Sequence, residues 1–300
     1  MRKIILNPQY KSLYTFIETL PQNFNAGGEI VQDRRNTIKK FKVNGLEINV
    51  KRYRVPIFIN RIAYTFFRKS KACRAYNNAF EVIKRGFETP ESIAYIEEFK
   101  GGLLHYSYYI SLQCPYRREI REYYQGPLQG NEALMTAFAQ FTAALHEKGV
   151  CHEDYSPGNV LIAQIDGQYH FSLVDINRMT FKPMNLEEGC KNFRRMFISD
   201  ELYIFLAKKY AQCRNFDQEA CIRLMLKYNH YSIRRDLGRL RTLSHDQARK
   251  TVHCNCFIIR LAVGGRKNAA MPVLLFNFLS QCILRQGKRL FRAGELVYAA

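Results

Sequence analysis

The sequence predicts an α+β protein with two lobes, a small β-rich N-terminal lobe that contains one main helix and a larger helical C-terminal lobe. Patterns that alternate apolar and polar residues are concentrated before Pro115, and helical spacing of apolar residues dominates from about Glu187 onward. A β-rich first part followed by a helix-rich second part is typical of two packed lobes. We expect the N-terminal lobe over residues 1–115, the C-terminal lobe over 116–230 and a basic C-terminal extension over 231–300.

A hairpin is the clearest feature of the N-terminal lobe. Thr37–Val43 and Leu46–Tyr53 alternate apolar with polar residues on either side of Asn44-Gly45. This dipeptide is typical of a tight primed turn, in which both central residues need a positive φ. Gly28–Gln32 supplies a strand before the hairpin, and the loop at residues 33–36 is basic rather than glycine-rich.

One helix and two more strands complete the N-terminal lobe. Apolar residues follow helical spacing over Ser70–Arg85, with a capping serine at its start, and Gly86 stands where a helix would end. Ser92–Glu98 and Tyr106–Leu112 then have the character of strands.

The C-terminal lobe begins with a helix and a second hairpin. Leu134–Lys148 carries an apolar stripe, and Gly149 ends it. After a short polar loop, Val160–Ile165 and Tyr169–Val174 flank Asp166-Gly167 as paired strands.

Composition excludes several classes of protein. The chain has 300 residues, 47% of them hydrophobic, with only 17 Gly and 9 Pro, which excludes a disordered or collagen-like chain. Nine scattered cysteines, an odd number, indicate a reducing, cytosolic compartment rather than a disulfide scaffold. The N-terminus has no apolar run typical of a signal peptide. The uncharged stretch Asn268–Leu284 is shorter than the roughly 20 residues of a membrane span, so we expect an interior or interfacial helix there.

The net positive charge restricts the classes of binding partner but does not identify one. The chain has 46 Lys and Arg against 26 Asp and Glu, a net charge of +20. Residues 231–300 alone hold 13 basic and 3 acidic residues. Such an excess attracts nucleic acid, anionic lipid or phosphorylated substrates, and it is equally compatible with a solvated basic face.

A polar loop between the helix and the hairpin has the residue types of a phosphotransferase site. Asp154 and Asn159 are separated by four residues, and Asp175 ends the returning strand. This is the arrangement of the protein-kinase catalytic loop, in which the first Asp orients the acceptor hydroxyl and the Asn and second Asp hold Mg²⁺. The alternative is that Asp154 and Asn159 only bond their own backbone as Asx turns. For His152 we expect a structural role in bracing the loop.

Two further residues stand in the order that a kinase requires. Lys51 lies in the third predicted strand, where its side chain shares a face with Tyr53 and Arg52 points the other way. Glu81 lies in the following helix, and its predicted pairing with Lys51 would aim the ammonium at the nucleotide phosphates. Each residue alone is an ordinary surface charge. Together with the loop they predict a protein-kinase-like fold and a nucleotide site.

With these residues in this order, the chain resembles the lipopolysaccharide kinase family. Its members are kinase-fold enzymes that phosphorylate Kdo or heptose sugars on the lipid A–inner core. It looks most similar to the branch found in Bacteroides-type bacteria, over roughly residues 1–230. The resemblance rests on the segments Asn49–Tyr53, Asn60–Lys71, Gly86–Glu97, His152–Asn159 and Val174–Met179.

The resemblance implies ATP and Mg²⁺ as cofactors and a sugar hydroxyl on a lipid A–Kdo type acceptor. It implies Asp154 as the base, Asn159 and Asp175 as metal ligands, and Lys51 and Glu81 at the nucleotide. A cytoplasmic protein that contacts the anionic inner-membrane surface peripherally would explain the positive charge. Candidates for that contact are the basic residues Lys69, Lys71, Arg194 and Arg195.

The chain departs from the kinase pattern in three places. No glycine-rich loop precedes Lys51, so backbone amides and Arg34, Arg35 or Asn36 would have to cover the phosphates. Asp-Ile-Asn-Arg at 175–178 replaces the protein-kinase Asp-Phe-Gly, which retains the metal-binding Asp and puts an activation-loop switch in doubt. Beyond about residue 230 nothing matches, and the spacing of His253, Cys254 and Cys256 is poor for zinc.

Other functions remain open at this point. One is a serine/threonine or other small-molecule kinase of the same fold, since the acceptor pocket has no readable motif. Another is a non-catalytic kinase-like binding protein, against which the retention of all five site residues argues. A basic nucleic-acid binder has charge as its only support, and no nucleic-acid partner is expected.

Overall fold

The computed structural model describes the chain except residues 124–126, 198 and 242–300, and it describes side chains up to Arg235. The chain divides into two units, Met1–Arg235 and Asp236–Ala300. Most of the predicted extension, including the stretch Asn268–Leu284 and the motif at residues 253–256, therefore lies outside the described residues.

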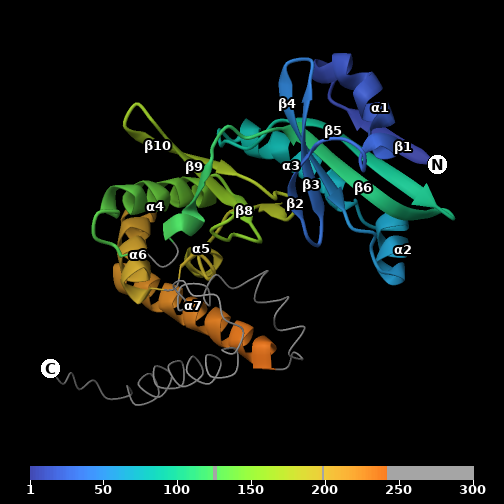
Figure 1. Ribbon diagram of the computed structural model, residues 1–300. Coiled ribbons are helices and arrows are strands. Elements are labelled where there is room, and N and C mark those ends of the chain that lie inside the picture. Colours follow the sequence, from blue (N-terminus) through green and yellow to red (C-terminus); the bar gives the residue numbers. More distant parts are fainter. Residues whose placement is uncertain (124–126, 198, 242–300) are drawn as a thin grey trace, which may run out of the picture. The chain divides into compact units, whose positions relative to one another are not determined.

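The N-terminal part is built on a six-stranded antiparallel sheet (Figure 1). Its strand order is β1-β5-β6-β4-β3-β2. The bounds are β1 Arg2–Leu6, β2 Glu29–Asp33, β3 Thr37–Val43, β4 Leu46–Tyr53, β5 Ser92–Lys100 and β6 Leu103–Leu112.

The predicted turn between β3 and β4 is confirmed. Asn44 and Gly45 have φ values of 51° and 78°, and Val43 pairs with Leu46 across them. The same register places Lys51 opposite Ile38. Lys51 therefore lies near the C-terminal end of β4, beside the start of β3 and the basic loop at residues 33–36 that precedes it.

The two faces of the sheet are covered by different helices. On one face α1 (Tyr14–Asn23) and the preceding 3₁₀ turn η1 (Pro8–Leu13) form a core with Ile48 and Val50 of β4. On the other face α3 (Lys71–Lys84) packs on β5 and β6, and Tyr53 lies in the core beneath it. Strand alternation thus sends Lys51 and Tyr53 toward α3, as predicted: the Lys51 ammonium lies 5.4 Å from the centre of the Tyr53 ring.

The predicted helix α3 has the cap that its sequence indicates. Ser70 Oγ accepts a hydrogen bond from the backbone N–H of Cys73 at 3.1 Å. Gly86 ends the segment with a φ of 83°, a conformation that favours glycine.

Three elements of this part were not predicted. These are strand β1, helix α1 and helix α2 (Phe58–Phe66), so the N-terminal lobe has more than one helix and Lys51 lies on the fourth strand rather than the third. Strand β1 is only five residues long, α1 contains Pro21 in its last turn, and α2 buries no side chain. The short β1 and the interrupted α1 leave weak periodic signals, whereas the apolar stripe of α2 faces outward rather than toward a core.

The C-terminal part is mainly helical, with short strands around the polar loop. Its core surrounds α4, whose Phe138 is fully buried among the rings of Tyr155, Phe171 and Phe193. The small sheets have the orders β10-β9-β7 and β11-β8. The bounds are β7 Arg118–Glu119, η2 Ile120–Tyr123, α4 Glu132–Glu147, β8 Val150–His152, β9 Val160–Ile165, β10 Gln168–Leu173, β11 Met179–Phe181, α5 Leu186–Asn192, α6 Asp200–Arg214 and α7 Gln218–Arg241.

The architecture confirms the predicted α+β fold, with a β-sheet in the first part and helices dominating the second. Within the described ranges, no helix combines the length and the apolar character that crossing a bilayer requires.

Candidate active site

The loop between β8 and β9 is held by buried contacts at both ends. The backbone N–H of Asn159 donates to Ser156 O, and the N–H of Val174 donates to Asn159 O. Tyr155 anchors the middle, because its ring is buried against Phe138 and its hydroxyl lies 2.8 Å from Thr142 Oγ1 on α4. The loop is therefore fixed to the C-terminal core and to the strand that leads to Asp175.

His152 braces this loop. Its Nδ1 accepts the backbone N–H of Asp154 at 3.1 Å, so the ring proton is on Nε2, which donates to Val174 O at 3.1 Å. Burial lowers the pKa of His152, which keeps the imidazole neutral. The histidine thus ties the backbone beside Asp154 to the backbone beside Asp175.

Asp154 lies between two arginines. Its Oδ1 accepts a hydrogen bond from Arg195 Nη1 at 2.9 Å, and Arg178 Nη1 lies 3.8 Å from Oδ2. About a third of the Asp154 side chain remains exposed. Arg195 therefore orients the carboxylate, which is still accessible from outside.

Asn159 turns its amide group inward. Its Nδ2 donates to Asp154 O at 2.8 Å, and this contact does not use the amide oxygen Oδ1. The neighbouring residue Gly158 lies against the guanidinium of Arg121. A Cβ at this position would come within 1.7 Å of Arg121 Nη2, so only glycine fits there. The Asn159 Nδ2 thus stabilises the loop, and Oδ1 can bind a cation.

Asp175 is held in an unusual backbone conformation. Its φ is 55°, in the left-handed region that Asp tolerates better than most residues but that still has an energetic cost. The Oδ1 atom accepts from Lys51 Nζ at 2.5 Å and from Asn177 Nδ2 at 2.5 Å. This ion pair joins β4 of the N-terminal sheet to the end of the second hairpin.

The electrostatics of Asp175 follow from these contacts. Burial by itself would raise the pKa of its carboxyl, but the charge and the hydrogen bond of Lys51, with a smaller effect from the Asn177 hydrogen bond, hold it below its usual value. Asp175 is therefore a carboxylate at neutral pH.

The donor set fits a magnesium ion carried on a nucleotide. Asp175 and Asn159 offer a carboxylate and an amide oxygen, the ligands that hard cations prefer. The buried Oδ1 of Asn177 has no hydrogen-bond partner in the described part of the chain. In the same part there is no cluster of three His, Cys, Asp or Glu side chains. A site with few carboxylates suits Mg²⁺, which commonly takes its remaining ligands from water and substrate phosphates.

The predicted pairing of Lys51 with Glu81 is wrong in this structure. Lys51 contacts Asp175, and Glu81 forms an ion pair with Arg85 one turn further along α3. Asn78, one turn before Glu81 on α3, is the residue that contacts the Asp175 segment, because its Nδ2 donates to Ile176 O at 2.7 Å.

A matching family model identifies the chain. The model, described as the lipopolysaccharide kinase (Kdo/WaaP) family, matches residues 28–217, which is more than half of the chain. The chain belongs to this family. The kinase is accordingly a phosphotransferase that uses ATP and acts on a sugar hydroxyl of the lipopolysaccharide core, and the resemblance found in the sequence is confirmed at the level of the family.

Solved structures agree with the kinase-like fold. A structure titled "WaaP in complex with acyl carrier protein" matches with a TM-score of 0.54 and 13% sequence identity, over 78% of this chain and 97% of that chain. At this identity the match shows the fold alone. The search of curated proteins found no match.

Several residues around the site of this kinase were not predicted as site residues. Arg195 and Arg178 flank Asp154, Asn177 and Asn78 contact the Asp175 segment, and Arg121 covers Gly158. The sequence indicates Arg195 only as a candidate membrane contact. The signal that could have found Asn177 and Arg178 is their position directly after Asp175, whereas Arg195 and Asn78 are distant in sequence.

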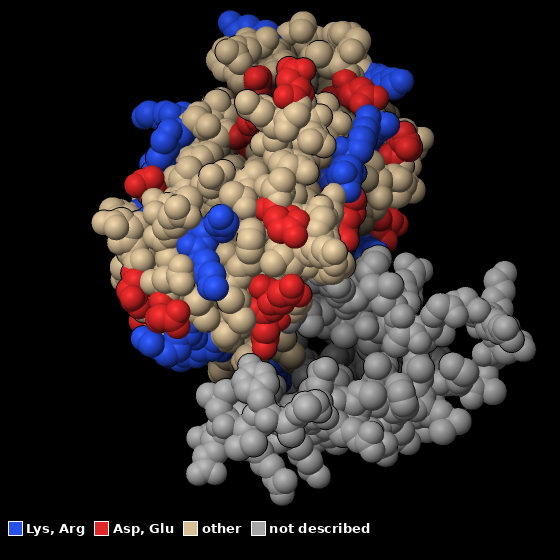
Figure 2. Space-filling model, turned by 90° about the vertical axis from the view of Figure 1, so that its left-hand side faces the viewer, with Lys and Arg blue, Asp and Glu red and all other residues tan. Residues whose placement is uncertain are grey.

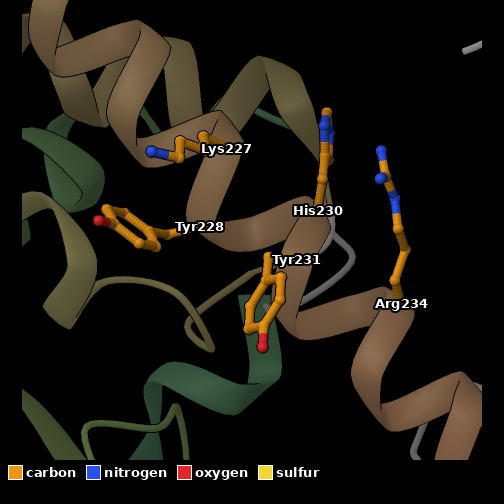
Figure 3. A pocket seen from close by; sticks show the side chains of 5 residues that line it. All are labelled: Lys227, Tyr228, His230, Tyr231 and Arg234. Carbon is orange, nitrogen blue, oxygen red and sulfur yellow. The ribbon is translucent and has the colours of Figure 1, made fainter.

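A pocket on α7 contains none of the predicted site residues. It follows a single helix, α7, and Figure 3 shows its side chains projecting from successive turns. Two of them already have partners, since Tyr228 hydrogen-bonds to Glu187 and His230 Nε2 lies 2.8 Å from Asp200 Oδ1. The lining residues are Lys227, Tyr228, His230, Tyr231 and Arg234.

Proposed function

We propose that this kinase transfers the γ-phosphate of ATP, with Mg²⁺, to a hydroxyl of Kdo on a lipid A-type acceptor. The observation that carries this proposal is the pair of arginines beside Asp154, because they make the acceptor side of the site cationic. Kdo carries a carboxylate, whereas an unmodified heptose is neutral. An arginine fork matches the geometry of a carboxylate, so the site favours the acidic sugar.

Asp154 is the residue proposed to accept the proton of the attacking hydroxyl. It is partly exposed, and Arg195 and its own backbone link to His152 fix its position. Arg178, half-exposed and 3.8 Å from the carboxylate, has room to contact the acceptor as well. Phosphoryl transfer depends mainly on such positioning and on charge stabilisation.

Lys51 and Asp175 are proposed to meet the nucleotide. Bound Mg²⁺ would supply charge neutralisation on the phosphates, held by Asp175 and Asn159. The Lys51 ammonium now pairs with Asp175, and a phosphate oxygen offers it an equivalent anionic partner. We assign no nucleotide contact to Glu81, since its carboxylate is engaged by Arg85.

Arg35, in the basic loop at residues 33–36 between β2 and β3, is proposed to cover the phosphates in place of a glycine-rich loop. Arg35 lies close enough to Lys71 to affect it: burial, followed by the charges of Arg35 and Arg178, lowers the pKa of Lys71, and Asp175 opposes them. Cations from the loop, from α3 and from the Asp175 segment thus surround one region, which suits a triphosphate.

The acceptor also suggests where the kinase works. A lipid-linked sugar acid is presented at a membrane surface, so we propose a cytoplasmic protein that contacts the inner membrane peripherally. The net charge of +20 favours approach to an anionic leaflet.

The test is transfer of labelled γ-phosphate from ATP-Mg²⁺ to purified Kdo-lipid A, with Asp175→Ala as the inactive control. Label on the lipid with the wild type and none with the variant supports the acceptor and the metal ligand together. Nucleotide binding in a thermal-shift assay without label on the lipid would favour a small-molecule kinase of the same fold. Absence of nucleotide binding would favour a kinase-like binding protein.

The choice of Kdo over heptose has its own control. Arg178→Gln should raise the KM for the Kdo acceptor about tenfold or more, since a charge-assisted hydrogen bond is lost, and leave kcat nearly unchanged. Arg178→Lys should lie in between, because it retains the charge without the fork. Equal rates on a heptose acceptor, unaffected by either variant, would contradict the preference for Kdo.

A further inference from the structure

Helix α2 has its apolar side turned away from the protein. Phe58, Ile59 and Phe66 are 64%, 74% and 66% exposed, and on a helical wheel they fall on one face with Ile62. Ile57 and Phe67, which flank the helix, are also exposed. No residue of α2 is buried. Five large apolar side chains exposed within eleven residues form the kind of patch that marks an interaction site.

The polar side of α2 is the side that holds it in place. Arg61 Nε donates to Leu104 O at 2.8 Å, and its Nη2 donates to Lys100 O at 2.9 Å. Thr65 Oγ1 accepts the backbone N–H of Leu104 at 2.9 Å. The helix is therefore fixed to the start of β6 by hydrogen bonds, so the outward orientation of its apolar face is built into the structure.

The surroundings of α2 are basic. Between Glu47 and Glu81 the sequence has no acidic residue. On the face of the molecule that Figure 2 shows, by contrast, acidic and basic side chains are interspersed. The basic residues of the acid-free stretch are Lys51, Arg52, Arg54, Arg61, Arg68, Lys69, Lys71 and Arg74.

An arginine pocket opens at the same end of the sheet. Arg34, Arg35, Arg52 and Arg54 line it together with Tyr106 of β6, the strand to which α2 is fixed. Arg52 is already held, with its guanidinium 4.4 Å from the centre of the Phe24 ring and a hydrogen bond to Asn25. The other three arginines are exposed. Several guanidinium groups around one hollow suit phosphate groups.

We propose that α2 and the arginine pocket form the surface by which this kinase docks on an anionic lipid bilayer. The apolar side chains at positions 57–59, 66 and 67 enter the boundary between headgroups and acyl chains, and Arg34 and Arg54 bind headgroup phosphates, whereas Arg35 stays with the nucleotide region. An outward apolar face flanked by cations is typical of interfacial helices, and an anionic leaflet complements both features. A neutral partner would leave the arginines unmatched.

The docking surface adjoins the candidate active site. Strand β4 carries Lys51 on the α3 side and Arg52 on the opposite side. Arg35 lines the pocket and also acts on Lys71, which in turn feels the charge of Asp175. A kinase docked through α2 would therefore hold its phosphate-binding region at the membrane, where a lipid-linked acceptor is presented. This inference rests on the proposed function for its purpose, but binding can be tested without ATP or acceptor.

The chain has no tryptophan, which allows a single reporter to be placed on α2. Phe66→Trp retains the apolar character of the site and should show a fluorescence shift to shorter wavelength, and quenching by brominated acyl chains, with vesicles containing phosphatidylglycerol. Ile165→Trp, on the exposed end of β9, is the matched control and should show neither. Vesicles of phosphatidylcholine alone should produce a much weaker response.

Sedimentation with the same vesicles tests the individual contributions. Phe58→Ser/Phe66→Ser should weaken binding at least about tenfold, since two aromatic side chains no longer leave water. Arg34→Gln/Arg54→Gln should weaken it by a similar factor and reduce its dependence on salt. Ile165→Ser should bind like the wild type. Thermal unfolding of each variant, expected to be unchanged because neither pair is buried, shows that the fold is retained.

Three results would overturn the proposal. They are failure of the wild type to bind anionic vesicles, equal binding by the α2 and arginine variants, and the same Trp response at positions 66 and 165. Binding of a purified acidic acyl carrier protein to α2, without any binding to vesicles, would replace the lipid by a protein partner. Because none of these measurements uses phosphate transfer, a failed kinase assay leaves their outcome unaffected.

Discussion

The catalytic loop and helix α2 follow opposite rules of burial. In the loop, polar groups are buried and matched: the His152 ring bonds to backbone atoms on both sides, and Asn192 Nδ2 donates to His152 O at 3.0 Å. In α2, apolar groups are exposed and the polar side chains Arg61 and Thr65 turn inward. Buried polar groups position reacting atoms, whereas exposed apolar groups have a use only if something else covers them.

The comparison predicts different consequences of mutation in the two regions. Changes in the loop or in its supporting core should alter catalysis or stability of the isolated kinase. Changes on the outer face of α2 should leave both intact and affect only binding to its partner.

The largest effect is expected at Asp154. Asp154→Asn should lower kcat about 10²- to 10⁴-fold, because it removes the proposed base and keeps the shape of the side chain. Steady-state transfer to Kdo-lipid A measures this, and Phe58→Ser/Phe66→Ser on a water-soluble Kdo acceptor is the comparison, with no expected change. Activity of Asp154→Asn within about tenfold of the wild type would remove Asp154 as the base.

Two phenylalanines make the contrast in burial directly measurable. Phe138→Ala should lower the free energy of unfolding by about 3–5 kcal/mol, since the fully buried ring leaves a cavity beneath the loop. Phe66→Ala should change it by less than about 0.5 kcal/mol, because the ring is mainly in water. Urea unfolding of both variants measures these changes. A large loss of unfolding free energy with Phe66→Ala would mean that α2 has a structural role.

The supporting core should also make stability depend on pH. His146 is buried between Tyr210 and Asn192, and burial lowers its pKa to about 4. Below about pH 6.5, His146 binds a proton in the unfolded chain but remains neutral in the folded protein. Stability should therefore fall between about pH 6.5 and 4, by up to roughly 3 kcal/mol from this residue.

Urea unfolding at pH 7.5, 5.5 and 4.5 measures this effect, with His146→Gln as the control. The control should lose less stability on acidification than the wild type. Parallel losses in the two proteins would assign the pH dependence to other groups, of which His152 is the first to examine, since burial lowers its pKa too.

The smallest loss of stability expected from a buried side chain is where α2 passes into α3. Ser70→Ala removes the cap on Cys73 N and should lower the free energy of unfolding by about 1 kcal/mol. Ser70→Asn, which retains an acceptor, should cost less. If both variants lose the same amount, the buried packing of Ser70 rather than its cap is what matters.

Much of the fold was predictable because its signals are local. The alternation over Leu46–Tyr53 and the turn at Asn44-Gly45 depend on neighbouring residues, and the structure confirms both. Helix α2 has a helical apolar stripe, but a prediction from pattern assigns such a face to the core. A prediction that always places the apolar face in the core cannot identify α2, because its polar side contacts the protein and its apolar side faces outward.

The candidate site was predictable in its order but not in its contacts. Asp154, Asn159 and Asp175 stand in a recognisable sequence around a hairpin, and the structure brings them together with Lys51. The expected role of Glu81 depended on which turn of α3 packs against the Asp175 segment, and the structure places Asn78 there. Arg195 could not be assigned because it reaches Asp154 from 41 residues away in sequence.

The sequence by itself determined the two hairpins with their turns, the main helix and the order of the phosphotransferase residues, since these follow from backbone preferences and side-chain spacing over a few residues. Only the tertiary structure decided which charges meet: Lys51 with Asp175, Arg195 with Asp154, and Glu81 with Arg85. It also decided which side of α2 faces water. The physical reason is that ion pairing and burial depend on distances between segments, and those distances arise only when the core has packed.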